Sequence, residues 1–158
     1  MAERNRLIFG NNDRIARWVA DQLPHMAGGM FATAAAIGVE RGSTLIAGIV
    51  YHGYNGGSDI QISMAATSPR WAEPGVIAAC LHYPFVQLKC RRVTCLVPQA
   101  LKRVHRFLVH LGFQVEGISR YGFDLEPAVT FGMVREECRW IPIEFRNQMW
   151  DTPKGRAS

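Results

Sequence analysis

The sequence lacks the long apolar runs that membrane proteins need. Its longest apolar stretch, residues 45–51, is interrupted by a glycine and is far shorter than the roughly 20 residues that cross a bilayer. The first nine residues also lack the apolar core of a secretory signal peptide. We therefore expect no membrane partner, and we expect a soluble protein of the cytoplasm.

The sequence also lacks internal repeats, low-complexity tracts and an obvious linker, because its 15 glycines and 8 prolines are spread along the chain. At 158 residues and 48% hydrophobic composition, the chain is long enough to bury one sizeable core. This predicts a single domain over residues 1–135. Residues 136–158 are expected to form a C-terminal extension whose last residues are flexible.

Cysteine is scarce, with four in the whole chain: Cys80, Cys90, Cys95 and Cys138. Their spacing matches neither a zinc site nor a redox-active pair, and three of them lie in apolar or strand-like surroundings. Free cysteine is among the most frequently buried residue types. We therefore expect four buried free thiols and no bound metal.

The net charge of +5 comes mainly from arginine. Such a balance favours an anionic partner, which could be a phosphate-bearing cofactor, a nucleic acid or an acidic protein surface. The sequence has no aromatic stacking pattern, zinc ligands or helix-turn-helix spacing typical of the common nucleic-acid-binding modules. Charge alone supports a nucleic acid, so this is the least favoured of our three functional hypotheses.

What the sequence does contain is an alternation of strand-like and helix-like periods. Strands are predicted over residues 31–39, 44–51, 59–66, 91–97, 114–120 and 128–135, and helices over residues 13–23, 74–88 and 98–111. The β-helix-β connections need parallel neighbours, whereas the hairpins need antiparallel ones. The expected class is therefore α/β (α+β), with one mixed sheet flanked by helices.

The most informative stretch is residues 97–117. It predicts a helix with one apolar stripe and one basic face, which begins near Pro98 and ends where Gly112 can adopt a left-handed conformation. The helix ends in the motif Leu111-Gly112-Phe113, and Glu116-Gly117 follows on the next predicted strand. The order of elements and these two motifs resemble the GNAT superfamily of acetyl-CoA-dependent N-acetyltransferases, over about residues 31–135. The nearest likeness is to the branch that modifies protein amino termini.

This resemblance implies a particular geometry in the middle of the sheet. The strand at residues 60–66 should splay from the strand at residues 91–97 and open a wedge between them. The pantetheine arm of acetyl-CoA would then pair with the main chain at Met64, Ala65 and Ala66. A backbone N–H there would stabilise the oxyanion that forms during acyl transfer.

The resemblance also places the coenzyme pyrophosphate at residues 70–75. There the family pattern is Gln or Arg, two residues, Gly, one residue, then Gly or Ala. Arg70 and Gly75 fit this pattern, whereas Glu73 replaces a glycine and Pro74 removes one amide donor. The residues expected to contact the coenzyme in this region are Arg70, Trp71, Ala72, Glu73, Gly75 and Val76, together with Arg103 on the later helix.

The same resemblance leaves the catalytic groups open. The family positions for an asparagine and for a tyrosine acid are occupied by Leu101 and Leu108. Candidate bases for the amine acceptor are Asp59, His52 and Glu116, and Tyr51, Tyr54 or Tyr121 could replace the missing acid. Each of the candidate bases could instead be a structural or solvated polar residue.

These departures motivate a second hypothesis, a GNAT-fold protein with lost or altered catalysis that acts as a binding or assembly module. The C-terminal extension carries Trp140, Phe145 and Trp150. An exposed aromatic set of this kind predicts self-association, in the form of a homodimer.

Overall fold

The computed structural model describes residues 3–26 and 35–147. They form one seven-stranded mixed sheet with the strand order β1-β2-β3-β4-β5-β7-β6. The strands are β1 (Asn5–Ile8), β2 (Ala35–Arg41), β3 (Thr44–His52), β4 (Asp59–Ala66), β5 (Arg92–Pro98), β6 (Gln114–Phe123) and β7 (Glu126–Val134). Only β4 and β5 are parallel, and every other neighbouring pair is antiparallel. The predicted mixed sheet is confirmed.

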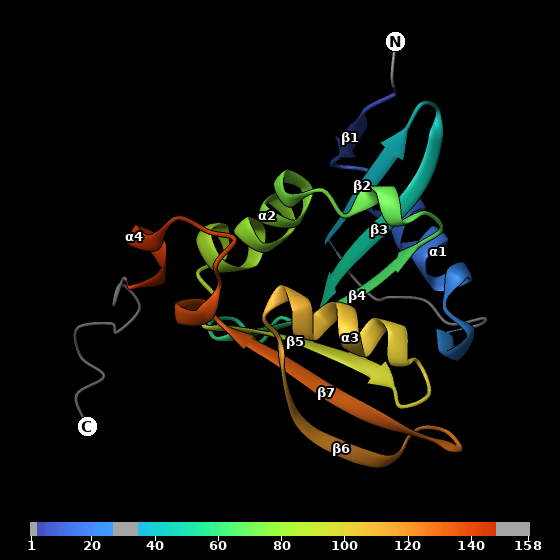
Figure 1. Cartoon of the computed structure of the whole chain (residues 1–158), viewed down its shortest axis with the longest axis vertical. Coiled ribbons are helices and arrows are strands. Elements are labelled where there is room, and N and C mark those ends of the chain that lie inside the picture. Colours follow the sequence, from blue (N-terminus) through green and yellow to red (C-terminus); the bar gives the residue numbers. More distant parts are fainter. Residues whose placement is uncertain (1–2, 27–34, 148–158) are drawn as a thin grey trace.

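Helices cover both faces of this sheet (Figure 1). They are α1 (Asn12–Gln22), α2 (Pro74–His82), α3 (Lys102–Leu111) and the short α4 (Ile143–Arg146). Three 3-10 turns span Pro24–Met26, Pro69–Trp71 and Arg135–Glu137, and a π-helical turn spans Tyr83–Gln87. The sheet therefore separates the core into two layers, and helices cover each of them.

The smaller layer lies under α1. Ile15 and Val19 of α1 are fully buried against Ala36 and Val50 of the sheet. Gly48 permits this close approach, because a Cβ atom at Gly48 would lie 2.6 Å from Cγ2 of Val19. On the other face, α2 and α3 contribute to one continuous larger cluster, in which Phe85 and Phe131 are completely buried.

Several predicted elements match the structure closely. The helix at α1 and the strand at β4 have the expected positions. Gly112 ends α3 in the left-handed conformation with φ 114°. All four cysteines are buried and form no disulfide bond, as expected. Positions 31–34 of the first predicted strand lie outside the described residues.

The helix ends were predicted less well. The helix expected over residues 74–88 is α-helical only to His82, and the chain then makes the π-helical turn that contains buried Pro84. Pro98 is the last residue of β5 and not part of α3, because its position opposite Ala128 of β7 extends the strand pairing. The prediction that α3 begins at Pro98 was therefore wrong by one turn.

Two strands were also misjudged. The edge strand β1 was not predicted, although it pairs with β2 over four residues. Tyr121 was placed in a loop, but β6 continues to Phe123 and leaves only Asp124 and Leu125 between β6 and β7. Tyr121 interrupts the regular pairing with a positive φ of 55°.

Residues 136–147 pack onto the body of the fold. Cys138 and Ile141 are buried in the larger core. Arg139 donates to the carbonyl oxygens of His110 and Leu111, and Trp140 Nε1 donates to the Leu111 carbonyl at 2.8 Å. These bonds satisfy carbonyl groups at the end of α3. Trp150, which belonged to the predicted association surface, lies outside the described residues.

Within the described ranges, no helix combines the length and apolar character required to traverse a membrane.

Candidate active site

The two parallel strands in the middle of the sheet separate along their length. β4 and β5 pair only at Asp59 with Arg92, Ile60 with Val93 and Gln61 with Thr94. β4 then continues to Ala66 and β5 to Pro98 without pairing to each other. The predicted splay is confirmed, and it leaves main-chain groups of both strands without sheet partners on the inner edges.

A groove of about 530 Å³ lies beside the carboxyl-terminal half of β4. Six of the residues expected to hold the coenzyme line it: Met64, Ala65, Ala66, Trp71, Ala72 and Arg103. The remaining lining residues are Gln22, Leu23, Thr67, Ser68, Pro69, Val104 and Phe107. The groove thus brings together the end of α1, the end of β4, the loop that follows β4, and α3.

The loop after β4 is held from both of its ends. The Ser68 hydroxyl oxygen accepts a hydrogen bond from the Arg70 amide at 3.3 Å and caps the 3-10 turn. The Trp71 ring is buried and meets the Phe107 ring of α3 edge-on, with 5.7 Å between the ring centroids. This aromatic pair joins the loop to α3 across the groove.

The amino end of α2 follows this loop. Pro74 occupies the first helical turn, where its missing N–H removes a donor that has no partner inside the helix. A Cβ atom at Gly75 would meet nothing within 4 Å, so this position is open. The Val76 side chain is buried in the core, and its amide bonds to the Glu73 carbonyl at 3.0 Å. The positive end of α2 still points toward the loop.

Two of the residues expected to contact the coenzyme have exposed side chains outside the groove lining. Arg70 is exposed, and its carbonyl oxygen accepts a hydrogen bond from Asn5 Nδ2 at 2.8 Å. The Glu73 carboxylate accepts a hydrogen bond from the same Asn5 amide group, and it lies 3.7 Å from Arg41 Nη1. The carboxylate is therefore directed at β1 and β2.

Among the candidate bases, His52 lies nearest in the strand register to the point of separation. It is opposite Gln61, the last β4 residue that pairs with β5. Its Nε2 lies 2.9 Å from the hydroxyl oxygen of Ser63, the residue just before Met64 of the groove. Burial lowers the pKa of His52 below its ordinary value of 6.5. The imidazole is consequently neutral at pH 7 and able to accept a proton.

Asp59 and Glu116, the other two candidate bases, meet at Arg92. Arg92 Nη2 is 2.5 Å from Glu116 Oε1, and Arg92 Nε is 3.4 Å from Asp59 Oδ1. The hydrogen bond that Arg92 donates to Glu116 is the main cause that raises the pKa of Arg92. Thr94 also donates its hydroxyl to Asp59 at 2.8 Å. Both carboxylates are engaged in this cluster.

Gly132 of β7 makes room for this arrangement. A Cβ atom at Gly132 would lie 2.3 Å from the carboxyl group of Glu116, which therefore packs directly over the glycine.

In the part of the chain that the structure describes, no group of three or more His, Cys, Asp or Glu side chains could hold a metal ion.

The tyrosines named as candidate acids do not line the groove. Tyr121 is 74% exposed on β6 at the far edge of the sheet. Tyr51 is buried, donates its hydroxyl to the Cys80 carbonyl at 2.5 Å, and has a pKa raised well above its ordinary value by that burial. Tyr54 is partly exposed in the turn after β3, and Leu108 is fully buried in α3. The structure brings none of these tyrosines into the groove lining.

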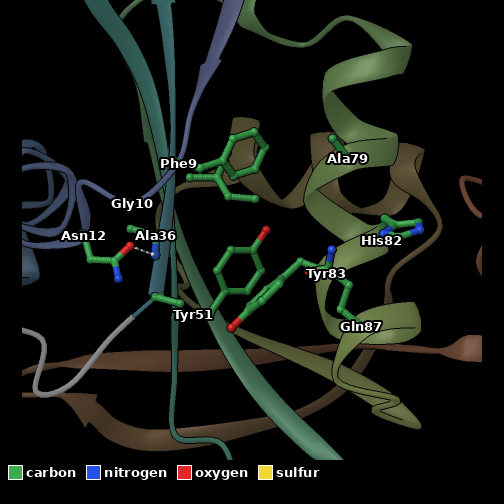
Figure 2. A pocket seen from close by; sticks show the side chains of 11 residues that line it. Phe9, Gly10, Asn12, Ala36, Tyr51, Ala79, His82, Tyr83 and Gln87 are labelled. Carbon is green, nitrogen blue, oxygen red and sulfur yellow. Dashed lines mark hydrogen bonds between the residues drawn. The ribbon is translucent and has the colours of Figure 1, made fainter.

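A second cavity, of about 360 Å³, lies between α2 and the strands β2 and β3 (Figure 2). The rings of Tyr51 and Tyr83 meet edge-on inside it, with centroids 4.8 Å apart, and Phe9 lies above them. Asn12 closes one side by accepting the Ala36 amide at 3.1 Å. Tyr51, one of the candidate acids, lines this cavity, whereas the predicted coenzyme residues and the candidate bases do not.

Comparison with known proteins assigns the fold. No protein-family model matches the sequence, and no curated protein matches it either. Solved structures do match. A GNAT-family acetyltransferase from Bacillus anthracis is 19% identical with a TM-score of 0.60, and the alignment covers 87% of this chain and 98% of that one. The chain has the fold of the GNAT acetyltransferases.

Two further neighbours with the GNAT fold have more specific descriptions. Mutant forms of the spermidine/spermine N-acetyltransferase SpeG from Vibrio cholerae match at 10% identity and a TM-score of 0.64, over 92% of this chain and all 100% of that one. Mycobacterium smegmatis RimJ, solved in complex with CoA-disulfide, matches at 15% identity and a TM-score of 0.57, over 72% of this chain. The chain spans 58% of the length of RimJ and 62% of a probable acetyltransferase.

Sequence reasoning missed several residues of this site. Phe107 and Val104 were hidden in the apolar stripe of α3, and Ser63 was seen only as one polar residue of an alternating strand. Ser63 directly precedes Met64, which was expected to contact the coenzyme, and this proximity could have indicated Ser63. No local pattern indicated Asn5 or Arg41, because both contact the loop through the fold.

Proposed function

We propose that this protein is an N-acetyltransferase that moves an acetyl group from acetyl-CoA to an amine by direct attack in a ternary complex. The observation that carries this proposal is the separation of β4 and β5 directly beside a groove whose lining includes Ala72, two residues before α2 begins. Unpaired main-chain groups on β4 suit an extended pantetheine arm, and a helix amino terminus suits its pyrophosphate. RimJ, which shares the fold, was solved with a form of CoA.

In this proposal the pantetheine arm pairs with the main chain at Met64, Ala65 and Ala66. Arg103 lies in the groove and supplies positive charge for the phosphates, and Arg70 in the preceding loop adds to it. Gly75 leaves the approach to α2 open. The net charge of +5 favours the same anionic ligand.

Bound acetyl-CoA supplies a thioester whose carbonyl carbon is open to attack. A new N–C bond forms to the amine and the C–S bond breaks. His52 accepts the proton that the amine must lose, either through the Ser63 hydroxyl or through a water. A β4 main-chain N–H stabilises the oxyanion. The departing thiolate is a tolerable leaving group with an ordinary thiol pKa of about 8.5, so a tyrosine such as Tyr121 is not required.

The role of Arg92 in this proposal is to fix Asp59 and Glu116 beside the paired part of β4 and β5. The two carboxylates neutralise the guanidinium and leave one net negative charge in the cluster. A positively charged amine would be attracted to this side of the sheet. Asp59 and Glu116 thus act on the acceptor, and His52 acts as the base.

The coenzyme is tested first, by the thermal midpoint of the protein with and without millimolar acetyl-CoA. Binding should raise the midpoint through linkage, and Gly75→Trp should abolish the rise by filling the open position. Transfer is then tested by release of free CoA thiol with a peptide amine, a lysine side chain and spermidine. No rise in the midpoint contradicts the proposal.

A second function is favoured by the absence of a tyrosine at Leu108, which is fully buried. It is that of a GNAT-fold binding or assembly module. A rise in the midpoint without thiol release from any of the amines would support it.

We also propose that the protein is cytoplasmic and forms a homodimer. Four cysteines that form no disulfide bond fit the reducing cytoplasm. For the proposed homodimer, sedimentation of the whole chain should be compared with that of a chain that ends at Asn147. A monomer in both cases contradicts self-association through the C-terminal segment.

A further inference from the structure

We propose that Arg41 and Asn5 are positioning residues that hold the Glu73 carboxylate away from the coenzyme pyrophosphate. This inference rests on the proposed function, because it assumes that acetyl-CoA binds at the amino end of α2. It explains how a chain with a glutamate in the phosphate-binding loop can still bind an anion there.

The three residues come from parts of the chain that are far apart. Asn5 and Arg41 are direct neighbours in the pairing of β1 with β2, and Glu73 precedes α2. Figure 1 shows the loop before α2 at the same end of the sheet as β1 and β2. Asn5 and Glu73 are separated by 68 positions in the sequence, so their contact depends on the fold.

Their contacts form a closed set. Arg41 Nη1 donates to Asn5 Oδ1 at 3.1 Å and lies 3.7 Å from Glu73 Oε1. The Asn5 side-chain amide donates to the Glu73 carboxylate and also to the Arg70 carbonyl oxygen at 2.8 Å. Asn5 therefore binds one side chain and one main-chain group of the same loop. The loop has its carboxylate and its backbone tied to the edge of the sheet.

The physical reason for this arrangement is charge. A free carboxylate at the amino end of α2 would occupy the positive end of the helix and repel a pyrophosphate. Arg41 is only 21% exposed, whereas Glu73 is 54% exposed, so the cation is the more firmly placed member of the pair. Pairing with Arg41 directs the negative charge to the sheet edge and partly neutralises it. The amino end of α2 remains available for the phosphates.

Two ligands distinguish this electrostatic role of Arg41 and Asn5 from a purely structural role. Acetyl-CoA carries the pyrophosphate, whereas acetylpantetheine carries the same thioester without it. Loss of Arg41 should leave an uncompensated carboxylate that repels only the charged ligand. If the substitution only disrupted the structure of the loop, the affinity for both ligands would fall.

The experiment measures the affinity of both ligands by calorimetry for the unmodified protein, Arg41→Ala, Asn5→Ala and the double variant Arg41→Ala with Glu73→Gln. Arg120→Ala is the control, because it removes one exposed charge from β6 at the opposite edge of the sheet. We expect Arg41→Ala and Asn5→Ala to lower the affinity for acetyl-CoA about fivefold, which corresponds to the contribution of one exposed charge pair. Acetylpantetheine should bind as before, and Glu73→Gln should restore the affinity.

The results that would overturn the inference are also defined. Unchanged binding of acetyl-CoA by Arg41→Ala, an equal loss for both ligands, or no recovery in the double variant would each contradict it. The single variant Glu73→Gln keeps the test open if Arg41→Ala does not fold. It should bind acetyl-CoA at least as tightly as the unmodified protein, and weaker binding contradicts the inference. Failure of the unmodified protein to bind acetyl-CoA would overturn the proposed function as well.

Discussion

Nε2 of His52 lies 2.9 Å from the hydroxyl oxygen of Ser63, at the place where β4 leaves β5. The contact crosses from β3 to β4 and joins a titratable ring to the strand that borders the groove. Asp59 and Glu116 have no such position, because Arg92 engages both of them. His52 is therefore the candidate base to substitute first.

His52→Gln should lower the rate of acetyl transfer about 100-fold near pH 7, the usual size of a general-base contribution. The pKa of His52 is lowered from 6.5 by burial. The unmodified enzyme should therefore keep its neutral base down to a pH below 6.5 and lose activity as the pH falls further. The variant should lack this acidic limb. A rate profile against pH that is the same in both proteins would remove His52 as the base.

Glu116→Gln should affect stability more than the pH profile. The substitution removes the charge that pairs with Arg92 at 2.5 Å, and a partly exposed pair of this kind contributes up to about 1 kcal/mol. Urea unfolding measures this loss. The acidic limb of the rate profile should remain in this variant, and its disappearance would assign the base to Glu116.

Arg103→Ala should lower the affinity for acetyl-CoA about tenfold. Arg103 lines the groove, and a charge-assisted hydrogen bond to phosphate contributes roughly 1.5 kcal/mol. Arg106→Ala is a matched control on the same helix, exposed but absent from the groove lining. Calorimetric titration with the coenzyme compares the two. Equal affinities in the two variants would place the phosphates elsewhere.

Gly48→Ala should destabilise the fold by about 1–3 kcal/mol, because an added methyl group overpacks the contact between β3 and α1. The new Cβ would lie 2.6 Å from Val19 Cγ2 and 3.1 Å from Ile15 Cγ2. Thermal and urea unfolding measure the effect. Gly75→Ala is the control, since its Cβ meets nothing within 4 Å, and an equally large loss there would contradict the packing argument.

Trp140→Phe should lower the free energy of unfolding by about 1 kcal/mol, the usual net contribution of one hydrogen bond. The lost bond is the 2.8 Å contact from Trp140 Nε1 to the Leu111 carbonyl at the end of α3. The phenyl ring is smaller than the indole, so lost packing against the core adds to the same decrease. A stability equal to that of the unmodified protein would show that this contact from residues 136–147 does not support α3.

The elements predicted well from the sequence are those with a strong local period or a local signal. β4 alternates polar and apolar residues from Asp59 to Met64, and Gly112 provides the left-handed end of α3. Pro98 misled the prediction, because proline can begin a helix or end a strand. Only its position opposite Ala128 in the sheet decides between the two.

The sequence by itself determined the class of fold, the splayed strand pair through its likeness to the GNAT family, and six of the thirteen residues that line the groove. It presented Glu73 as a poor residue for a phosphate-binding loop. Only the tertiary structure decided that the Glu73 carboxylate faces Asn5 and Arg41 on the edge of the sheet. The reason is that local periods report which face a residue occupies, whereas the partner of a charged side chain depends on strands that the fold brings together from distant parts of the chain.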